Sequence, residues 1–158
     1  MSRAFVKEMD ETAEGPLPPD DPHPLYVTPD GLAQLRTRLA ALRAETAGEL
    51  PDEPAERQHQ QHLRRDAKIL ERKIGRAITV EPQPTDKVAI GHTVTLEDDD
   101  GRQHKFRIVG EDQADPARGW IGWLSPLGTV LLGAEVDDQV TWRRPSGALA
   151  LTVTAIDI

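Results

Sequence analysis

The chain of 158 residues has no cysteine, which excludes disulfide bonds and thiolate chemistry. It also lacks any run approaching the roughly 18 apolar residues of a membrane span, and its first residues lack the apolar core of a signal peptide. We therefore expect a cytoplasmic protein with no membrane segment. Hydrophobic residues make up 37% of the chain and charged residues 29%, which is little for a single compact core. This composition favours a small globular unit joined to an appendage.

The net charge of −8 is distributed unevenly along the chain. Residues 1–27 carry two basic and six acidic side chains, residues 28–77 carry ten and eight, and the remainder carries seven and thirteen. An acidic C-terminal part argues against direct binding to a nucleic-acid backbone, which requires clustered Lys and Arg. A run of basic side chains in the second half of the middle segment forms either a solvated helix face or a docking surface. It consists of Arg57, Arg64, Arg65, Lys68, Arg72, Lys73 and Arg76.

Residues 28–78 show apolar residues at alternating spacings of three and four, which is typical of a helix buried along one narrow stripe. Two prolines within residues 48–54 (Gly-Glu-Leu-Pro-Asp-Glu-Pro) prevent one continuous helix. We therefore predict an antiparallel coiled-coil hairpin with arms of similar length. Its stripe consists of Leu32, Leu35, Leu39 and Leu42 in the first arm and Leu63, Ala67, Leu70, Ile74 and Ala77 in the second.

Residues 1–27 are acidic and rich in proline, and they contain few large apolar side chains. Such a segment buries too little surface to offset the entropy that it loses on ordering. We predict a tail that is disordered or loosely attached and that ends where the hairpin begins. Thr28 and Pro29 mark that start, because threonine caps free amide groups and proline suits the first helical position.

The apolar pattern of residues 79–158 has a period of two, which is the signature of β-strands. Alternating segments flank an acidic turn at residues 98–101, and a second turn contains Pro145. The fold class that follows is α+β, with an N-terminal helical hairpin before a small antiparallel β domain. The strands are expected at residues 93–97, 102–109, 120–123, 139–143 and 148–156, with a short helix at 127–132.

Several short motifs occur in order along the chain. They are residues 27–32 (Val-Thr-Pro-Asp-Gly-Leu), 94–98 (Val-Thr-Leu-Glu-Asp), 106–112 (Phe-Arg-Ile-Val-Gly-Glu-Asp), 125–128 (Ser-Pro-Leu-Gly), 131–133 (Leu-Leu-Gly) and 136–140 (Val-Asp-Asp-Gln-Val). Together they resemble the GreA/GreB family of transcript cleavage factors over roughly residues 26–158. The resemblance implies an FKBP-like C-terminal domain that binds RNA polymerase at its secondary channel, while the coiled coil enters that channel. It also implies that Ser125, Pro126 and Leu127 lie on the polymerase-facing side.

The family's chemistry lies at the hairpin tip, where two acidic residues help to hold a second Mg²⁺ in the polymerase active site. Mg²⁺ accepts one or two carboxylates beside waters and phosphate oxygens, and two metals can promote RNA hydrolysis. At the matching positions this chain has Glu49 where the family has Asp, and Asp52 where the family has Glu. The resemblance therefore implies a protein that is not itself an enzyme and shares Mg²⁺ with its partner. We expect a monomer that meets nucleic acid only through the polymerase.

The first arm is several turns shorter than the arm of the family, and each missing turn removes about 5.4 Å of reach. Metal ligands must be placed within a few tenths of an ångström, so a short tip cannot supply one. Two hypotheses follow. The chain is either a polymerase-binding regulator that does not stimulate cleavage or a cleavage factor acting through Glu49 and Asp52.

Two further interpretations concern side chains outside these motifs. His59 and His62 have a spacing that permits metal binding, but no third ligand follows from the sequence. The three tryptophans form either core contacts or the aromatic pocket of a free-standing prolyl isomerase; they are Trp120, Trp123 and Trp142. Trp120 and Trp123 are three residues apart in a predicted strand, so their side chains point to opposite faces, which favours core packing.

Overall fold

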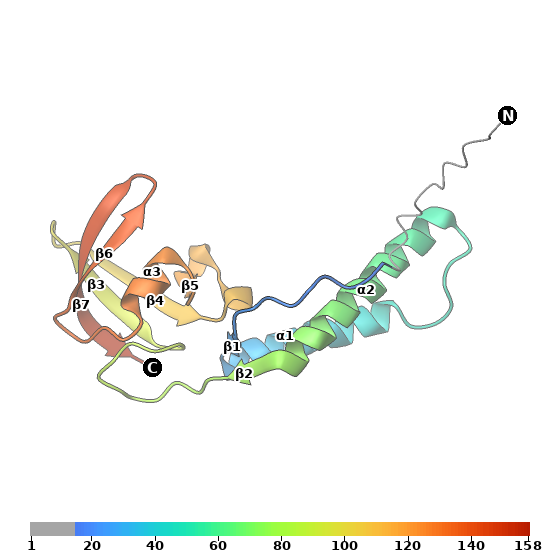
Figure 1. Ribbon diagram of the computed structural model, residues 1–158, viewed down its shortest axis with the longest axis horizontal. Helices are drawn as coiled ribbons and strands as arrows, with labels where there is room; N and C mark the ends of the chain where they lie inside the picture. The colour runs from blue at the N-terminus through green and yellow to red at the C-terminus, as the bar shows by residue number, and fades with distance from the viewer. Residues whose placement is uncertain (1–14) are drawn as a thin grey trace. The chain divides into compact units, whose positions relative to one another are not determined.

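The computed structural model describes residues 15–158, and residues 1–14 of the predicted tail lie outside the described part. Contacts divide the chain into two units, each described below by itself. Of the described residues, one unit contains residues 15–22 together with Leu35–Gly75, and the other contains His23–Gln34 and Arg76–Ile158. Two long helices precede a β-sheet along the chain, which confirms the predicted α+β class (Figure 1).

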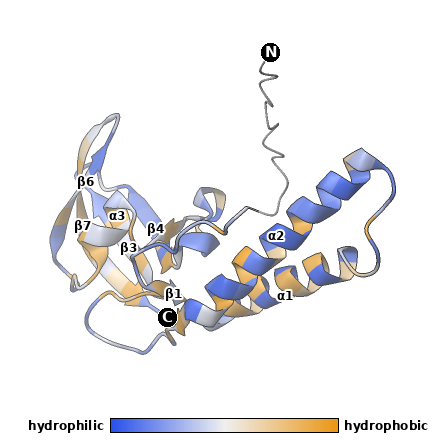
Figure 2. Cartoon of the chain, turned by 45° about the vertical axis from the view of Figure 1, so that its right-hand side comes forward, coloured by the Kyte–Doolittle hydropathy of each residue, from blue (hydrophilic) through white to orange (hydrophobic). Residues whose placement is uncertain are grey.

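The two helices form the predicted hairpin with nearly the predicted bounds. Helix α1 spans Pro29–Glu45 and helix α2 spans Pro54–Arg76. The stripe residues Leu35, Leu39, Ala67 and Leu70 are buried, and an ion pair of 3.1 Å joins Arg43 to Glu71 across the helices. Figure 2 shows the first turns of α2 as almost entirely hydrophilic, with hydrophobic residues nearer its C-terminal end. The buried stripe therefore provides the apolar contact between the two helices, and polar side chains add bonds between them.

The predicted tail contacts other parts of the chain within residues 15–27. Residues 15–22 lie along α2, where arginine side chains bind their backbone carbonyls. Strand β1 follows at Leu25–Val27, and Val27 is fully buried. The composition of the segment provides little apolar surface, but contacts to its backbone do not depend on apolar side chains.

A short parallel pair of strands joins the two ends of the hairpin. Strand β1 pairs with β2, which spans Ala77–Thr79, and Leu25 lies opposite Ala77. Each strand has only three residues, so neither produces a recognisable alternating pattern. Ala77, which the periodicity placed at the end of the helical stripe, is instead the first residue of β2.

A buried polar network fixes the start of α1 within the second unit. Thr28 is 1% exposed, and its hydroxyl accepts a hydrogen bond from the backbone N–H of Gly31 at 3.2 Å, which caps the helix. The amide of Gln113, in the 3-10 helix η1 (Glu111–Gln113), donates to the same hydroxyl at 2.8 Å and accepts from the Thr28 N–H at 3.2 Å. A side chain on Gly31 would collide with Gln113, at 2.1 Å. Residues 23–34 therefore belong with the C-terminal unit, which differs from the predicted boundary at residue 28.

The C-terminal unit contains a five-stranded sheet in the order β5-β4-β3-β7-β6. Neighbouring strands are antiparallel except β4 and β5, which pair in parallel. The pair is parallel because the chain returns between β4 and β5 through η1 and a second 3-10 helix, η2 (Pro116–Arg118), rather than through a tight hairpin. The strands are β3 (Thr93–Asp98), β4 (Gln103–Val109), β5 (Trp120–Gly122), β6 (Gln139–Arg144) and β7 (Gly147–Asp157).

The core of this unit lies between the sheet and helix α3 (Pro126–Leu131). Val94 and Leu96 alternate with more exposed threonines along β3, and both are completely buried. Leu131 of α3 is also completely buried in the same cluster. Burying a side chain of this size stabilises the fold by about 1.5–3 kcal/mol, so the position of α3 is strongly fixed.

The turn between β3 and β4 is organised by Asp98. Its carboxylate accepts hydrogen bonds from His104 Nε2 at 3.0 Å and from the backbone N–H groups of Arg102 and Asp100 at 2.9 and 3.0 Å. These bonds, that of His104 foremost, lower the pKa of the Asp98 carboxyl group below its usual value.

Within residues 15–158, neither long helix contains an apolar stretch of the length that a bilayer crossing requires.

We expect Gln113→Leu to lower the free energy of unfolding by about 1–3 kcal/mol, because it leaves the buried polar groups of Thr28 without their partner. Urea unfolding monitored by circular dichroism measures the change. Gln103→Leu is the matched control, since Gln103 is exposed on β4. Equal midpoints for the two variants would contradict the importance of the buried network.

We expect Asp98→Asn to weaken the dependence of stability on pH in acid. A carboxyl group with a lowered pKa in the folded state stabilises the fold above its unfolded pKa of about 3.9, and this contribution is lost as the pH falls through the folded pKa. The wild type should therefore lose stability below about pH 5 more steeply than the variant. Urea midpoints measured from pH 7 down to pH 3 test this, with Asp99→Asn as the control. Parallel curves for wild type and Asp98→Asn would rule out the assigned role.

Candidate functional site

The loop between α1 and α2 is held by two arginines of α2. Arg57 donates from Nε to the carbonyl of Pro51 at 2.9 Å and from Nη2 to the carbonyl of Asp52 at 3.0 Å. Arg64 donates to the carbonyls of Thr46 and Gly48 at 3.1 and 2.8 Å. The loop is therefore fixed through its backbone, and its acidic side chains are not needed to hold it.

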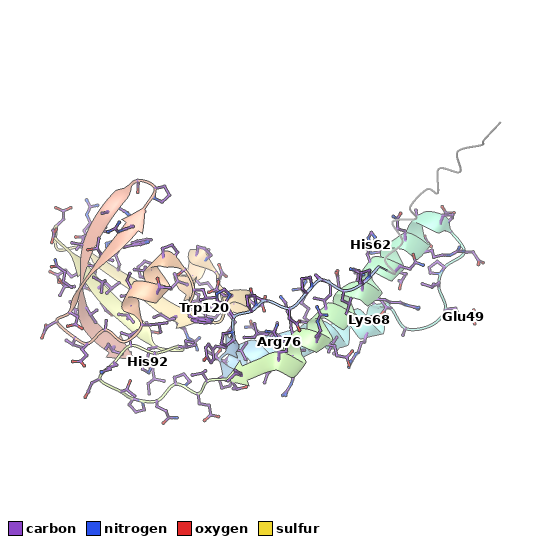
Figure 3. The ribbon with its side chains drawn as sticks, viewed as in Figure 1. Glu49, His62, Lys68, Arg76, His92 and Trp120 are labelled. Carbon is purple, nitrogen blue, oxygen red and sulfur yellow. The ribbon has the colours of Figure 1, made fainter. Side chains whose placement is uncertain are left out.

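Glu49 and Asp52, the two predicted tip carboxylates, lie on this loop and are exposed. Figure 3 shows Glu49 on the loop that joins the two helices. Gly48 beside it has a φ of 93°, a left-handed conformation that glycine adopts without strain. The arrangement presents both carboxylates to solvent, where they can supply ligands to an ion that is held elsewhere.

The described residues 15–158 contain no group of three or more His, Cys, Asp or Glu side chains that could hold a metal ion. Glu49 and Asp52 therefore have no third ligand from the described chain, and His59 and His62 have none either. A metal site built from the tip would need additional ligands from a partner.

The motif Ser-Pro-Leu-Gly at residues 125–128 forms the start of α3. The hydroxyl of Ser125 accepts a hydrogen bond from the backbone N–H of Gly128 at 3.0 Å, and Pro126 occupies the first turn. Gly128 packs so closely that an added Cβ would lie 2.3 Å from the carbonyl oxygen of Gly122. The motif thus has a structural explanation of its own as a capped helix that packs directly on the end of β5.

Only part of the predicted polymerase-facing set is accessible. Pro126 is exposed and Ser125 is half-buried, but Leu127 is 2% exposed and lies in the core. The role predicted for Ser125, Pro126 and Leu127 stays a prediction. In the structure, the Leu127 side chain is packed in the core. The buried Leu127 side chain anchors the start of α3, where Ser125 and Pro126 lie.

The outer face of α3 continues the exposed surface beyond Pro126. Thr129 and Val130 follow it by three and four residues and are exposed, with Val130 38% accessible. Sequence reasoning did not include these two residues. The helical spacing from Pro126 could have indicated them, because residues three and four apart share one face of a helix.

The three tryptophans pack against different neighbours. The guanidinium groups of Arg107 and Arg118 lie over the ring of Trp120, at 5.2 and 5.1 Å from its centroid. Trp123 meets Tyr26 edge to face at 5.0 Å. Trp142 meets Phe106 at 5.8 Å and Arg144 at 5.3 Å. These separate contacts favour the packing interpretation over a shared aromatic pocket.

Comparisons with known proteins bear on both the β domain and the whole chain. The family model described as "Transcription elongation factor, GreA/GreB, C-term" matches residues 83–158. The transcription elongation factor GreA of Sphingopyxis alaskensis is 34% identical over 145 residues, which covers 81% of this chain and 92% of that protein. The transcription elongation factor GreB of Xanthomonas axonopodis pv. citri is 31% identical over 159 residues, which covers 89% and 95%.

Among solved structures, the crystal structure of GreA factor homolog 1 of Thermus thermophilus aligns with 86% of this chain and 100% of its own length. Its sequence identity is 23% and its TM-score is 0.44. The assignment rests on the sequence relatives instead, since both extend across nearly their full lengths and so include the hairpin as well as the β domain. This chain belongs to the GreA/GreB family of transcription elongation factors.

Proposed function

We propose that this protein binds RNA polymerase through its β domain and regulates elongation without stimulating transcript cleavage. In this proposal the hairpin enters the secondary channel of the polymerase, and the protein acts in the cytoplasm, where transcription takes place. The names of its relatives support the elongation role, because they are transcription elongation factors. The single observation behind the absence of cleavage is the length of α1.

Helix α1 contains 17 residues, which corresponds to about 25 Å at 1.5 Å per residue. A ligand to a catalytic metal must reach its position within a few tenths of an ångström. In this proposal the hairpin is several helical turns shorter than the hairpin typical of the family, so Glu49 and Asp52 at its tip do not reach the metal. The hairpin then acts by occupying space in the channel.

A second candidate function is active cleavage stimulation through Glu49 and Asp52. The specific observation in its favour is that both carboxylates are exposed on a loop whose backbone Arg57 and Arg64 hold in place. A fixed loop reduces the entropy lost when its carboxylates bind an ion shared with the polymerase. Mg²⁺ would be the shared ion.

For docking, we propose that the exposed face of α3 formed by Pro126, Thr129 and Val130 touches the polymerase. This face lies on a short helix whose buried side is anchored by Leu127 and Leu131. A rigid, partly apolar surface loses little conformational entropy on binding, which suits it to be the centre of an interface.

We expect Pro126→Glu to weaken binding to RNA polymerase about tenfold or more, because it places a charge in the centre of the docking face. The variant should fold, since a glutamate in the first turn complements the positive end of the helix. Pro145→Glu is the matched control, because Pro145 is exposed in the turn between β6 and β7. Fluorescence anisotropy of labelled protein titrated with polymerase measures both. Equal affinities would remove α3 from the interface.

We expect the combined change Glu49→Ala and Asp52→Ala to leave polymerase binding unchanged. The rate of transcript shortening in a stalled, backtracked complex should be the same with wild type, with the variant and without either protein. Gel analysis of 3′-end cleavage in Mg²⁺ buffer gives this rate. Faster shortening with wild type, lost in the double variant, would establish the second candidate function instead.

A further inference from the structure

A proline-rich segment of the N-terminal region, residues 15–22 (Gly-Pro-Leu-Pro-Pro-Asp-Asp-Pro), lies along α2; we refer to it as the strap (Figures 1 and 3). Its binding surface on α2 contains Arg65 and Arg72. These two arginines are seven residues apart, which is about two helical turns, so they lie on one face of the helix. The family-matching motifs begin only after the strap and do not account for it.

The contacts between strap and helix are hydrogen bonds from guanidinium groups to the backbone. Arg65 donates to the carbonyls of Gly15 and Pro16 at 2.6 and 2.7 Å. Arg72 donates to the carbonyl of Pro18 and forms an ion pair with Asp20 at 2.9 Å. Each arginine thus binds two acceptors of the strap.

The sequence of the strap suits this mode of binding. Proline-rich segments favour extended conformations without internal hydrogen bonds, so their carbonyls remain available as acceptors. The planar guanidinium group has donors in a fork that can meet two neighbouring oxygens at once. The proline rings also reduce the entropy that the strap loses when it binds.

The strap is held weakly enough to detach. Its contacts lie at the surface, and the side chains of Arg72 and Asp20 are 34% and 45% exposed. Exposed ion pairs contribute about 1 kcal/mol or less, and segments with few buried contacts open at small cost in free energy. Bound and detached states are therefore both accessible to the molecule.

We propose that the strap is an autoinhibitory contact, which withholds Arg65 and Arg72 from the phosphates of single-stranded RNA until it detaches. The guanidinium fork that binds these carbonyls also fits phosphate oxygens, and with a phosphate it gains a charge interaction that a neutral backbone carbonyl cannot offer. The choice of RNA rests on the proposed function, because RNA is the polyanion that a transcribing polymerase produces.

The test measures binding of a fluorescently labelled uridine oligomer of about 12 nucleotides at low salt, where phosphate contacts are strongest. The full chain is compared with chains that lack residues 1–14 or residues 1–22. Residues 1–14 carry four acidic and two basic side chains and residues 15–22 carry two acidic ones, so each step removes the same net charge. We expect removal of residues 15–22 to lower the Kd roughly three- to tenfold, and removal of residues 1–14 alone to change it little.

Substitutions identify the arginines that cause the gain in affinity for the oligomer. In the chain lacking residues 1–22, Arg65→Gln with Arg72→Gln should abolish the gain, while the exposed pair Arg36→Gln with Arg38→Gln on α1 should preserve most of it. In the full chain, Asp20→Asn should produce a smaller gain in affinity by loosening the strap without truncation. Circular dichroism confirms that each variant keeps its helices.

The proposal is overturned if the two deletion steps give equal gains, if neither gives any, if the gain survives loss of Arg65 and Arg72, or if no variant binds the oligomer. None of these results affects the proposed docking of the β domain. That docking is tested separately by Pro126→Glu and polymerase binding, so failure of one proposal can be distinguished from failure of the other.

Discussion

Hydrogen bonds from arginines of α2 to backbone carbonyls are the interaction that positions the non-helical segments of the hairpin unit. Arg57 and Arg64 hold the loop at the tip, and Arg65 and Arg72 hold the strap. The buried stripe packs α1 against α2 but contributes nothing to these irregular segments. Helix α2 therefore contacts α1 through apolar side chains, and it contacts the loop and the strap through arginines.

The position of the loop between α1 and α2 therefore does not depend on the loop's acidic side chains. Because the loop carbonyls are bound by guanidinium groups, Glu49 and Asp52 are free of any structural task in the loop. Their carboxylates can change without unfolding it. The roles of side chains are likewise separate in α3, where Leu127 and Leu131 serve the core and the outward residues Pro126 and Val130 serve the surface.

The sequence predicted the elements whose patterns are long and repetitive. The leucine stripe identified both helices, and alternation along Val94 and Leu96 identified β3. It did not reveal β1 and β2, because strands of three residues are too short to show an alternating pattern. It also did not reveal the contacts of residues 15–22 with α2, because bonds to backbone carbonyls do not depend on amino-acid composition. The link between Thr28 and Gln113 spans 85 positions and rests on one amide, so only the three-dimensional structure shows it.

Both ends of the hairpin belong to the C-terminal unit, which contains His23–Gln34 and Arg76–Ile158, and there β1 pairs with β2. The loop at the tip is bound by Arg57 and Arg64 of α2 itself. Equal insertions of seven residues in each arm would keep the stripe in register and leave the β unit untouched. Hairpin length is thus a quantity that evolution or protein engineering can adjust in steps, independently of the five-stranded sheet and α3.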